Sequence, residues 1–272
     1  MKIRHIATRF ALLLGIACVT LISFYLFIVH PWWFPAGVSA HAPAMDRQFT
    51  IAFRLLGGLF LAGQFVLVAA LFRGRSSSGD MPRSWYGNWR FEIAWTLAIS
   101  AIFFGLSLAG EKLWSQMRIH DADPGALAVE VTGMQFQWYF RYAGKDGKPG
   151  RVDAQRYAHP DEGNPLGIDP SDPAGADDIV SSTLVLPEGR DVLLTLRSQD
   201  VIHSLFIPAM RFKQDAVPGM EIHAHFKPTQ AGTYEIACTQ LCGLGHYRMR
   251  AAVRVVSEEE FRKWLDEKSK SK

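Results

Sequence analysis

The chain is organised around the stretch Cys238-Thr-Gln-Leu-Cys242-Gly-Leu-Gly-His246-Tyr-Arg-Met249. Two thiols, an imidazole and a thioether fall within a short loop. Thiolate and thioether are soft ligands that favour copper, and zinc would have little use for a methionine placed here. Two buried cysteines and a core methionine are the ordinary structural alternative. The spacing favours a metal, so the sequence predicts a copper-binding loop.

A loop of this form brings its two thiols close enough to bridge a pair of metal ions. One more side chain is needed to complete the set of ligands. His203, within Asp200-Val-Ile-His-Ser-Leu-Phe-Ile-Pro208, is the best candidate, because it lies on a predicted strand beside which the loop could be brought. His223 and His225 alternate along one strand and share a face. No Cys or carboxylate pattern accompanies them, so we interpret that face as solvated. Two other histidines are expected at the surface: His41 and His159.

The composition divides the chain into two parts. Residues 1–117 carry 10 Lys and Arg against 4 Asp and Glu, whereas residues 118–272 carry 19 against 22. The chain of 272 residues is long enough for one sizeable domain and a second part. Its three cysteines define no disulfide framework. The two parts are therefore expected in different surroundings.

An apolar run from Phe10 to Val29 follows a basic start and is about as long as the ~20 residues that a bilayer requires. A signal peptide is the alternative, with Val38-Ser39-Ala40 as an acceptable cleavage site. The run is longer than the ~7 to 15 residues of a usual signal core. An aromatic stretch, Pro31-Trp32-Trp33-Phe34, follows it and suits a membrane interface. We therefore favour a retained helix.

Two further apolar runs, Phe49 to Phe72 and Phe91 to Ala109, predict a transmembrane hairpin. Arg54 lies near one end of the first run, where its side chain can reach the interface. The segment between the two runs is basic, so the positive-inside rule places it in the cytoplasm. Everything after Ala109 is then extracytoplasmic. The basic residues of that segment are Arg73, Arg75, Arg83 and Arg90.

The remainder predicts an all-β domain, a small antiparallel sandwich or barrel, because short runs rich in β-branched and aromatic residues alternate with Gly and Pro. Gly144 to Asp178 is polar and acidic and is predicted to be a long surface loop. Ser257-Glu-Glu-Glu260 is a capping box that opens a helix to about Lys268. The predicted strands are Ala128–Thr132, Gln137–Tyr142, Ile179–Leu186, Val192–Leu196, Val201–Ile207, Glu221–Phe226, Tyr234–Ala237 and Ala251–Val256.

Four segments together resemble subunit II of cytochrome c oxidase. They are the copper loop, the Asp200 to Pro208 segment, Lys213-Gln-Asp-Ala-Val-Pro-Gly219 and Glu92-Ile-Ala-Trp95-Thr96. The resemblance covers roughly Phe49 to Lys272. It implies a membrane-anchored all-β protein, in which transmembrane helices precede a cupredoxin-like Greek-key β-barrel with the dinuclear copper centre CuA. The expected parts are an extra N-terminal helix and outer loop (1–48), a helical hairpin (49–117) and an extracytoplasmic domain (118–272).

The resemblance also implies roles for single residues. Cys238 and Cys242 would bridge the two coppers, and His203 and His246 would each bind one. Met249 would be a weak ligand, and the backbone carbonyl of residue 240 would complete the second copper. Many members have a Glu at that position, where its carboxylate also binds magnesium. The residue here is Gln240, a poor anionic ligand, which weakens the case for magnesium.

Three further positions match the family in part. The aromatic residue that first receives electrons, usually Trp, matches Phe136 here, and Trp138 matches the second Trp. Glu92 matches a glutamate at the mouth of a proton pathway into subunit I. The alternative to a proton-pathway role is structural: an acidic residue at a helix N-terminus is stabilised by the helix dipole, and Glu92 has that position.

The implied function is to accept electrons from cytochrome c and pass them to haem in subunit I, where oxygen is reduced and protons are pumped. The partners would be subunit I, other oxidase subunits, cytochrome c and a bacterial-type plasma membrane with the copper domain in the periplasm. No nucleic acid and no catalytic acid, base or nucleophile on this chain are expected. The acidic soluble half suits a basic cytochrome c, because complementary charge speeds encounter.

Other functions remain open at this point. The same electron-accepting module could serve an enzyme that reduces nitric oxide, since that chemistry would lie on another chain. A membrane-anchored structural or copper-delivery protein would need fewer ligands and leaves Glu92-Ile-Ala-Trp95-Thr96 unexplained. Quinol oxidase subunits share the fold but typically lack the copper ligands.

Overall fold

The computed structural model describes residues 2–29, 35–73, 87–118, 121–157 and 163–270. The chain forms two compact units. The first combines Met1–Trp33 with Asp46–Glu111, and the second combines Phe34–Met45 with Lys112–Lys272. The aromatic stretch at 31–34, most of the basic segment at 73–90, and His159 lie wholly or partly outside the described residues.

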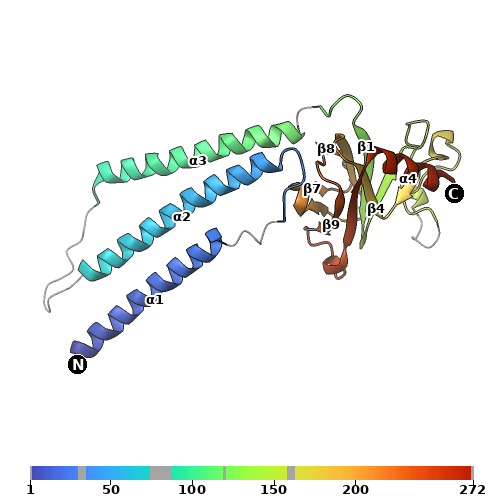
Figure 1. The fold of residues 1–272 in the computed structure, drawn as a ribbon. Coiled ribbons are helices and arrows are strands. Elements are labelled where there is room, and N and C mark those ends of the chain that lie inside the picture. The colour runs from blue at the N-terminus through green and yellow to red at the C-terminus, as the bar shows by residue number, and fades with distance from the viewer. Residues whose placement is uncertain (1, 30–34, 74–86, 119–120, 158–162, 271–272) are drawn as a thin grey trace. The chain divides into compact units, whose positions relative to one another are not determined.

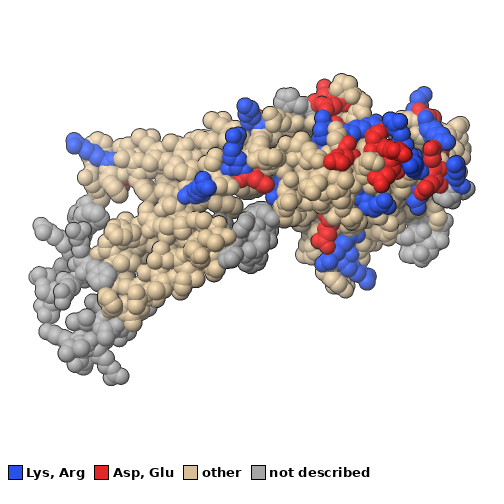
Figure 2. All heavy atoms as spheres, viewed as in Figure 1, with Lys and Arg blue, Asp and Glu red and all other residues tan. Residues whose placement is uncertain are grey.

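The first unit is helical and contains α1 (Lys2–Val29) and most of α2 (Ala42–Arg73) and α3 (Trp89–Arg118) (Figure 1). Ala42–Ala70 and Trp89–Arg118 are long and apolar enough to cross a membrane. Their apolar side chains are exposed, as suits lipid contact, and charged side chains are sparse along them (Figure 2). In α1 the apolar stretch Leu13–Leu26 is shorter. The two predicted apolar helices are confirmed as candidate spans, while their membrane hairpin and a third span in α1 stay predictions.

The second unit is a sandwich of two five-stranded sheets around one hydrophobic core (Figure 1). The largest fully buried side chains come from both sheets and include Trp138, Phe140 and Phe212. In one sheet the order is β3 (Ile179–Ser181), β2 (Gln137–Tyr142), β1 (Leu127–Met134), β5 (Val192–Ser198) and β8 (Ile222–Phe226). In the other it is β4 (Thr183–Pro187), β10 (Arg250–Val256), β9 (Gly232–Cys238), β6 (His203–Ile207) and β7 (Phe212–Ala216).

The expected antiparallel sandwich is confirmed for most strand pairs, but β1 pairs with β5 and β10 with β4 in parallel. The expected single strand Ile179–Leu186 is also two strands, which lie in different sheets. The chain changes sheet at Ser182, where the Ser181 hydroxyl donates to the Thr183 carbonyl (2.8 Å) and accepts from the Thr183 N–H (3.0 Å). Such local side-chain hydrogen bonds compete with the strand ladder and make a bend.

Strand β7 is missing from the predicted set. Its sequence, Phe-Lys-Gln-Asp-Ala, is polar, and only Phe212 and Ala216 are buried. The strand lies at the edge of its sheet and pairs only with β6 there. An edge strand needs few apolar residues, since one side and much of its surface face solvent. Its sequence therefore lacks the apolar signal that identifies inner strands.

The helix α4 (Glu258–Lys270) begins as predicted. The Glu260 N–H donates to Ser257 Oγ (3.2 Å), and the Ser257 N–H donates to Glu260 Oε2 (3.1 Å). This reciprocal pair is a capping box. Trp264 packs edge-on against Tyr142, with ring centroids 5.0 Å apart. The helix therefore covers one end of the core.

The segment 144–178 is less of a surface loop than expected. Asp178 is fully buried, and its Oδ2 accepts hydrogen bonds from Arg141 Nη1 (3.0 Å) and the Gly150 N–H (2.9 Å). Arg141 also pairs with Glu130. A buried carboxylate needs a cation and hydrogen-bond donors, which Arg141 and Gly150 supply. This anchor attaches the segment to β2 and corrects the prediction for Asp178.

Candidate metal centre

Two neighbouring strands hold His203 and Cys238 side by side. His203 begins β6 and Cys238 ends β9, and these strands pair antiparallel with Leu205 opposite Cys238. Just beyond, the Thr239 N–H donates to the Ser204 carbonyl (3.1 Å). The ladder therefore fixes the imidazole and the first thiol relative to one another, although 34 residues separate them in the chain.

The loop after β9 returns to its own start. The Cys238 N–H donates to the Met249 carbonyl (3.1 Å), which closes the loop directly before β10. A short 3-10 turn, His246–Arg248, directs the chain back. Cys242 and Met249 are buried, whereas His246 is half-buried. The loop thus turns its sulfur side chains inward over the end of the sandwich.

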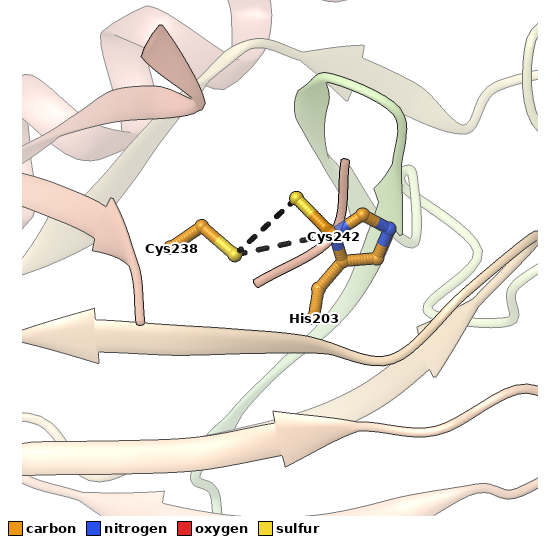
Figure 3. Close-up of side chains that lie close together, drawn as sticks. All are labelled: His203, Cys238 and Cys242. Carbon is orange, nitrogen blue, oxygen red and sulfur yellow. Dashed lines mark hydrogen bonds between the residues drawn. The ribbon is translucent and has the colours of Figure 1, made fainter. Parts of the chain in front are cut away.

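The donor atoms converge (Figure 3). The sulfurs of Cys238 and Cys242 lie 3.9 Å apart, and Cys238 Sγ lies 4.0 Å from His203 Nδ1. On the other side, Cys242 Sγ lies 3.5 Å from His246 Nδ1 and 3.8 Å from Met249 Sδ. The carbonyl of Gln240 is 3.2 Å from Cys238 Sγ. All six side chains or carbonyls that the sequence singled out are therefore brought together.

The site favours a thiolate at Cys238. Burial alone would raise the pKa of this thiol, but hydrogen bonds with His203, nearby backbone groups and His246 outweigh it and lower the pKa to about 6. Burial and the neighbouring Cys238 charge raise the pKa of Cys242 to about 11. Burial would lower the pKa of His203, yet its hydrogen bonds with Cys238 and Asp200 raise it. The first negative charge therefore resides on Cys238.

These donors fit a soft metal. Ligand atoms of His203, Cys238 and Cys242 lie within 4.8 Å of one another, and all three residues are buried. Two thiol sulfurs with an imidazole nitrogen on each side and a thioether nearby suit copper better than zinc or magnesium. The two histidines lie on different sides of the sulfur pair, with His203 next to Cys238 and His246 next to Cys242. The chemistry of the donor set therefore fits copper.

Two aromatic residues lie beside the centre at different depths. Trp138 is fully buried, with its ring centroid 5.8 Å from that of His203. Phe136 is half-buried and packs so closely on the loop that a Cβ at Gly243 would lie 3.2 Å from its ring, while one at Gly245 would overlap it. Of the two, Phe136 is the one that reaches the surface.

Glu92 and the competing histidines take no part in this cluster. Glu92 lies in the first turn of α3, in the other unit. His223 is exposed and bonds Thr195 Oγ1 (3.1 Å), while His225 bonds the Asp191 carboxylate (3.1 Å). The interpretation of their strand face is confirmed for exposed His223, whereas His225 is mostly buried. His41, expected at the surface, is partly buried and lies 3.3 Å from Ser39 Oγ.

Sequence reasoning missed two residues that support the centre. Asp200 Oδ1 lies 2.7 Å from His203 Nε2, and Gln135 Nε2 donates to the Cys242 carbonyl (2.5 Å). Asp200 stands three residues before His203 within a motif already identified, so its position was a usable signal. Nothing local marks Gln135, because its contact with Cys242 spans 107 residues of sequence.

Two apolar helices joined to a two-sheet sandwich with a buried Cys and His cluster define a membrane-anchored protein of the cupredoxin-like class. The family model "Cytochrome C oxidase subunit II, periplasmic domain" matches residues 127–256. The chain is 34% identical over 261 residues to the alternative cytochrome c oxidase subunit 2 of Bradyrhizobium diazoefficiens, covering 94% of this chain and 91% of that relative. The chain therefore belongs to the cytochrome c oxidase subunit II family.

Two other proteins are similar to this chain. Cytochrome c oxidase subunit 2 of Thermostichus vulcanus is 28% identical over 301 residues, covering 90% of this chain and 81% of that relative. Among solved structures, the periplasmic domain of subunit II of cytochrome oxidase from Bradyrhizobium japonicum is 28% identical, with a TM-score of 0.41, and the match covers 56% of this chain and 98% of that domain. The relatives are subunits of an oxidoreductase, and the matched domain is periplasmic in name.

Proposed function

We propose that this chain is the electron-accepting subunit of a cytochrome c oxidase in a bacterial-type plasma membrane. It takes electrons from a c-type cytochrome on the periplasmic side and passes them to haem in subunit I, where oxygen is reduced and protons are pumped. The observation that carries the proposal is the convergence of the Cys238, Cys242, His203, His246 and Met249 donor atoms in one buried cluster.

In this proposal Cys238 and Cys242 would hold the copper pair between them. His203 would bind one copper and His246 the other, each through Nδ1, the nitrogen that faces a sulfur. Met249 would be a weak ligand, and the Gln240 carbonyl would complete the second copper. A dinuclear copper centre supplies a one-electron carrier whose charge is spread over two metals. Magnesium is not part of the proposal, because Gln240 provides an amide in place of a carboxylate.

The protein's contribution is a rigid, largely dry cluster. The β6–β9 ladder and the closed loop hold the donors by backbone hydrogen bonds, so little of the site has to rearrange when an electron arrives. Cys242, Met249 and His203 are at most 4% exposed, which excludes most water. A preorganised site of this kind lowers the reorganisation that accompanies charge transfer. Fast transfer at a small driving force follows.

The electron donor would dock on the exposed part of the copper loop. Leu244 is 97% exposed, Leu241 78% and Tyr247 75%. Exposed large apolar side chains clustered on one loop suit contact with a partner protein. Phe136 packs beneath this loop, so we assign it as the residue that first receives the electron, with Trp138 behind it beside His203.

The acidic segment is a weaker candidate for steering a basic cytochrome. Asp169 and Asp172 pair with Arg151 at 3.4 and 3.3 Å, and Asp153 pairs with Arg156 at 3.3 Å. These arginines neutralise much of the local negative charge. Electrostatic steering depends on the net field of a surface and not on its count of acids. We therefore expect apolar contact to contribute more than charge.

The N-terminal half would anchor this module. In the proposed organisation, residues 49–117 form a transmembrane hairpin, residues 1–48 add a helix and an outer loop, and residues 118–272 form the copper domain. Glu92, in the first turn of α3, would lie at the cytoplasmic end of its helix, where a carboxylate can admit protons toward subunit I. Glu92→Gln in the assembled oxidase, with proton pumping and oxygen uptake measured separately, tests that role.

The proposed centre is tested by loading the detergent-solubilised full chain with copper. Two coppers per chain, and an electron paramagnetic resonance pattern from one electron shared by two copper nuclei, are expected. One copper per chain, or hyperfine coupling to a single copper nucleus, would contradict the dinuclear assignment. A nitric oxide reductase subunit is the alternative function. Purifying the assembled complex and comparing oxygen with nitric oxide as electron acceptor separates the two.

A further inference from the structure

The Asp200 carboxylate joins the buried His203 to the turn between β1 and β2. Its Oδ1 lies 2.7 Å from His203 Nε2 and also accepts the Val201 N–H (2.7 Å). Its other oxygen, Oδ2, accepts the Gln135 N–H (2.6 Å). Both oxygens are thus engaged, and the side chain is only 30% exposed. Both carboxylate oxygens of Asp200 therefore have partners within the chain.

This contact distinguishes the two ring nitrogens of His203. A carboxylate accepts hydrogen bonds, so the proton of a neutral imidazole is held on Nε2, which faces Asp200. When the ring is neutral, Nδ1 is therefore bare, whereas in the protonated ring Nδ1–H donates to the Cys238 sulfur 4.0 Å away. The Trp138 ring packs edge-on against the imidazole, with the ring planes at 68°. In the neutral ring the lone pair of Nδ1 is thus directed toward the sulfurs.

The second histidine is held differently. His246 is half-buried, and its Nδ1 lies 3.5 Å from Cys242 Sγ. Among the residues that the structure describes, no carboxylate forms a hydrogen bond with the His246 ring. The two imidazoles are therefore unequal in burial and in their hydrogen-bond partners. A carboxylate behind a ligating histidine fixes its tautomer and makes it a stronger donor.

We propose that Asp200 is a positioning residue that holds His203 in the Nε2–H tautomer and raises the donor strength of its Nδ1. Through Gln135 it also ties this histidine to the turn that carries Phe136 and to the loop of Cys242, because the Gln135 side chain donates to the Cys242 carbonyl. The part of this proposal that concerns copper rests on the proposed function. The part that concerns the tautomer does not.

The tautomer is tested on the metal-free full chain in detergent, with nitrogen-15 in its histidines, at a pH where imidazole is neutral. His203→Gln identifies the His203 signals. The wild-type chain should give one pyrrole-type and one pyridine-type nitrogen for His203, whereas Asp200→Ala should give averaged shifts of mixed tautomers. Asp215→Asn is the matched control, because Asp215 bonds Ser204 Oγ (2.6 Å) and Lys213 on the same sheet and has no hydrogen bond with His203. An unchanged His203 spectrum in a folded Asp200→Ala chain overturns the proposal.

Copper provides the second measurement. Removing a residue behind a metal ligand typically weakens metal binding by about 10- to 100-fold, which is expected for Asp200→Ala. Asp200→Asn should retain copper but shift the reduction potential of the centre to a more positive value, because an uncharged partner donates less to the oxidised metal. Asp215→Asn should change neither quantity. Equal potentials in the wild type and Asp200→Asn would contradict the assignment, whereas a wild type that binds no copper pair would refute the proposed function and leave the tautomer result standing.

Discussion

Leu205 on β6 is paired with Cys238 on β9, and this register places His203 beside the first thiol. In a strand, side chains two residues apart point to the same face. His203 and Leu205 are therefore on one face with Cys238, and the imidazole reaches the sulfur at 4.0 Å. A slip of one residue would turn the histidine to the opposite face. The metal centre thus depends on a strand pairing as much as on its ligands.

The bridging thiols are the first testable element. Cys238→Ser or Cys242→Ser should abolish binding of a copper pair, because a hydroxyl is a hard and weakly acidic ligand. Copper content and the electron paramagnetic resonance signal of the full chain measure this. Cys18→Ser is the matched control, since Cys18 is an exposed residue of α1, in the other compact unit. A normal signal in either site variant would remove the thiolate bridge from the proposal.

Met249 should affect the potential of the centre more than its occupancy. Its sulfur lies 3.8 Å from Cys242 Sγ in a buried position, so Met249→Leu preserves volume while it removes the thioether. Copper should remain bound, and the reduction potential should change, as expected for a weak ligand. Voltammetry of the loaded chain measures the shift. Met220→Leu, at a site 54% exposed, should leave the potential unchanged.

The two thiols should titrate far apart in the metal-free chain. The pKa of Cys238 is lowered to about 6 and that of Cys242 is raised to about 11. On raising the pH, Cys238 should therefore lose its proton first and Cys242 last. Ultraviolet absorbance of the thiolate in a Cys18→Ser background gives the two steps. In a further Cys238→Ser variant, persistence of the lower step would show that it belongs to another group.

The buried Arg141–Asp178 pair should matter greatly for stability. Arg141→Ala leaves the fully buried Asp178 carboxylate without its cation, and removal of one partner from a buried pair costs about 3 to 5 kcal/mol. Thermal unfolding of the chain in detergent should therefore occur at a clearly lower temperature. Arg151→Ala removes a cation that is 73% exposed and should lie within about 0.5 kcal/mol of the wild type. Similar unfolding temperatures for both variants would contradict this anchor.

Docking of the electron donor should depend on Leu244. This side chain is 97% exposed on the copper loop, so Leu244→Ser should lower the second-order rate of reduction by a c-type cytochrome. The copper signal should persist, because Leu244 provides no ligand. Asp169→Asn, in the acidic segment, should change the rate little, since its charge is already paired with Arg151. A steep fall of the wild-type rate with ionic strength would instead favour steering by charge.

Much of the fold could be predicted from local patterns. Apolar runs near bilayer length identified α2 and α3, the capping box identified α4, and alternating β-branched residues identified most strands. The failures have physical causes. The edge strand β7 needs little apolar surface, and the change of sheet at Ser182 depends on hydrogen bonds of one hydroxyl. Parallel pairing of β1 with β5 involves residues far apart, so no local pattern encodes it.

The sequence by itself determined the set of donor groups, because the loop from Cys238 to Met249 contains soft ligands at a spacing that favours copper over zinc. It also indicated the family, since the segment Asp200 to Pro208, which contains His203, is a second motif that resembles cytochrome c oxidase subunit II. Only the tertiary structure decided that Asp200 holds the outer nitrogen of that histidine and that Gln135 reaches the Cys242 carbonyl. Those contacts arise when paired strands bring distant segments together. Ligand type is a property of the residues, whereas ligand orientation is a property of the fold.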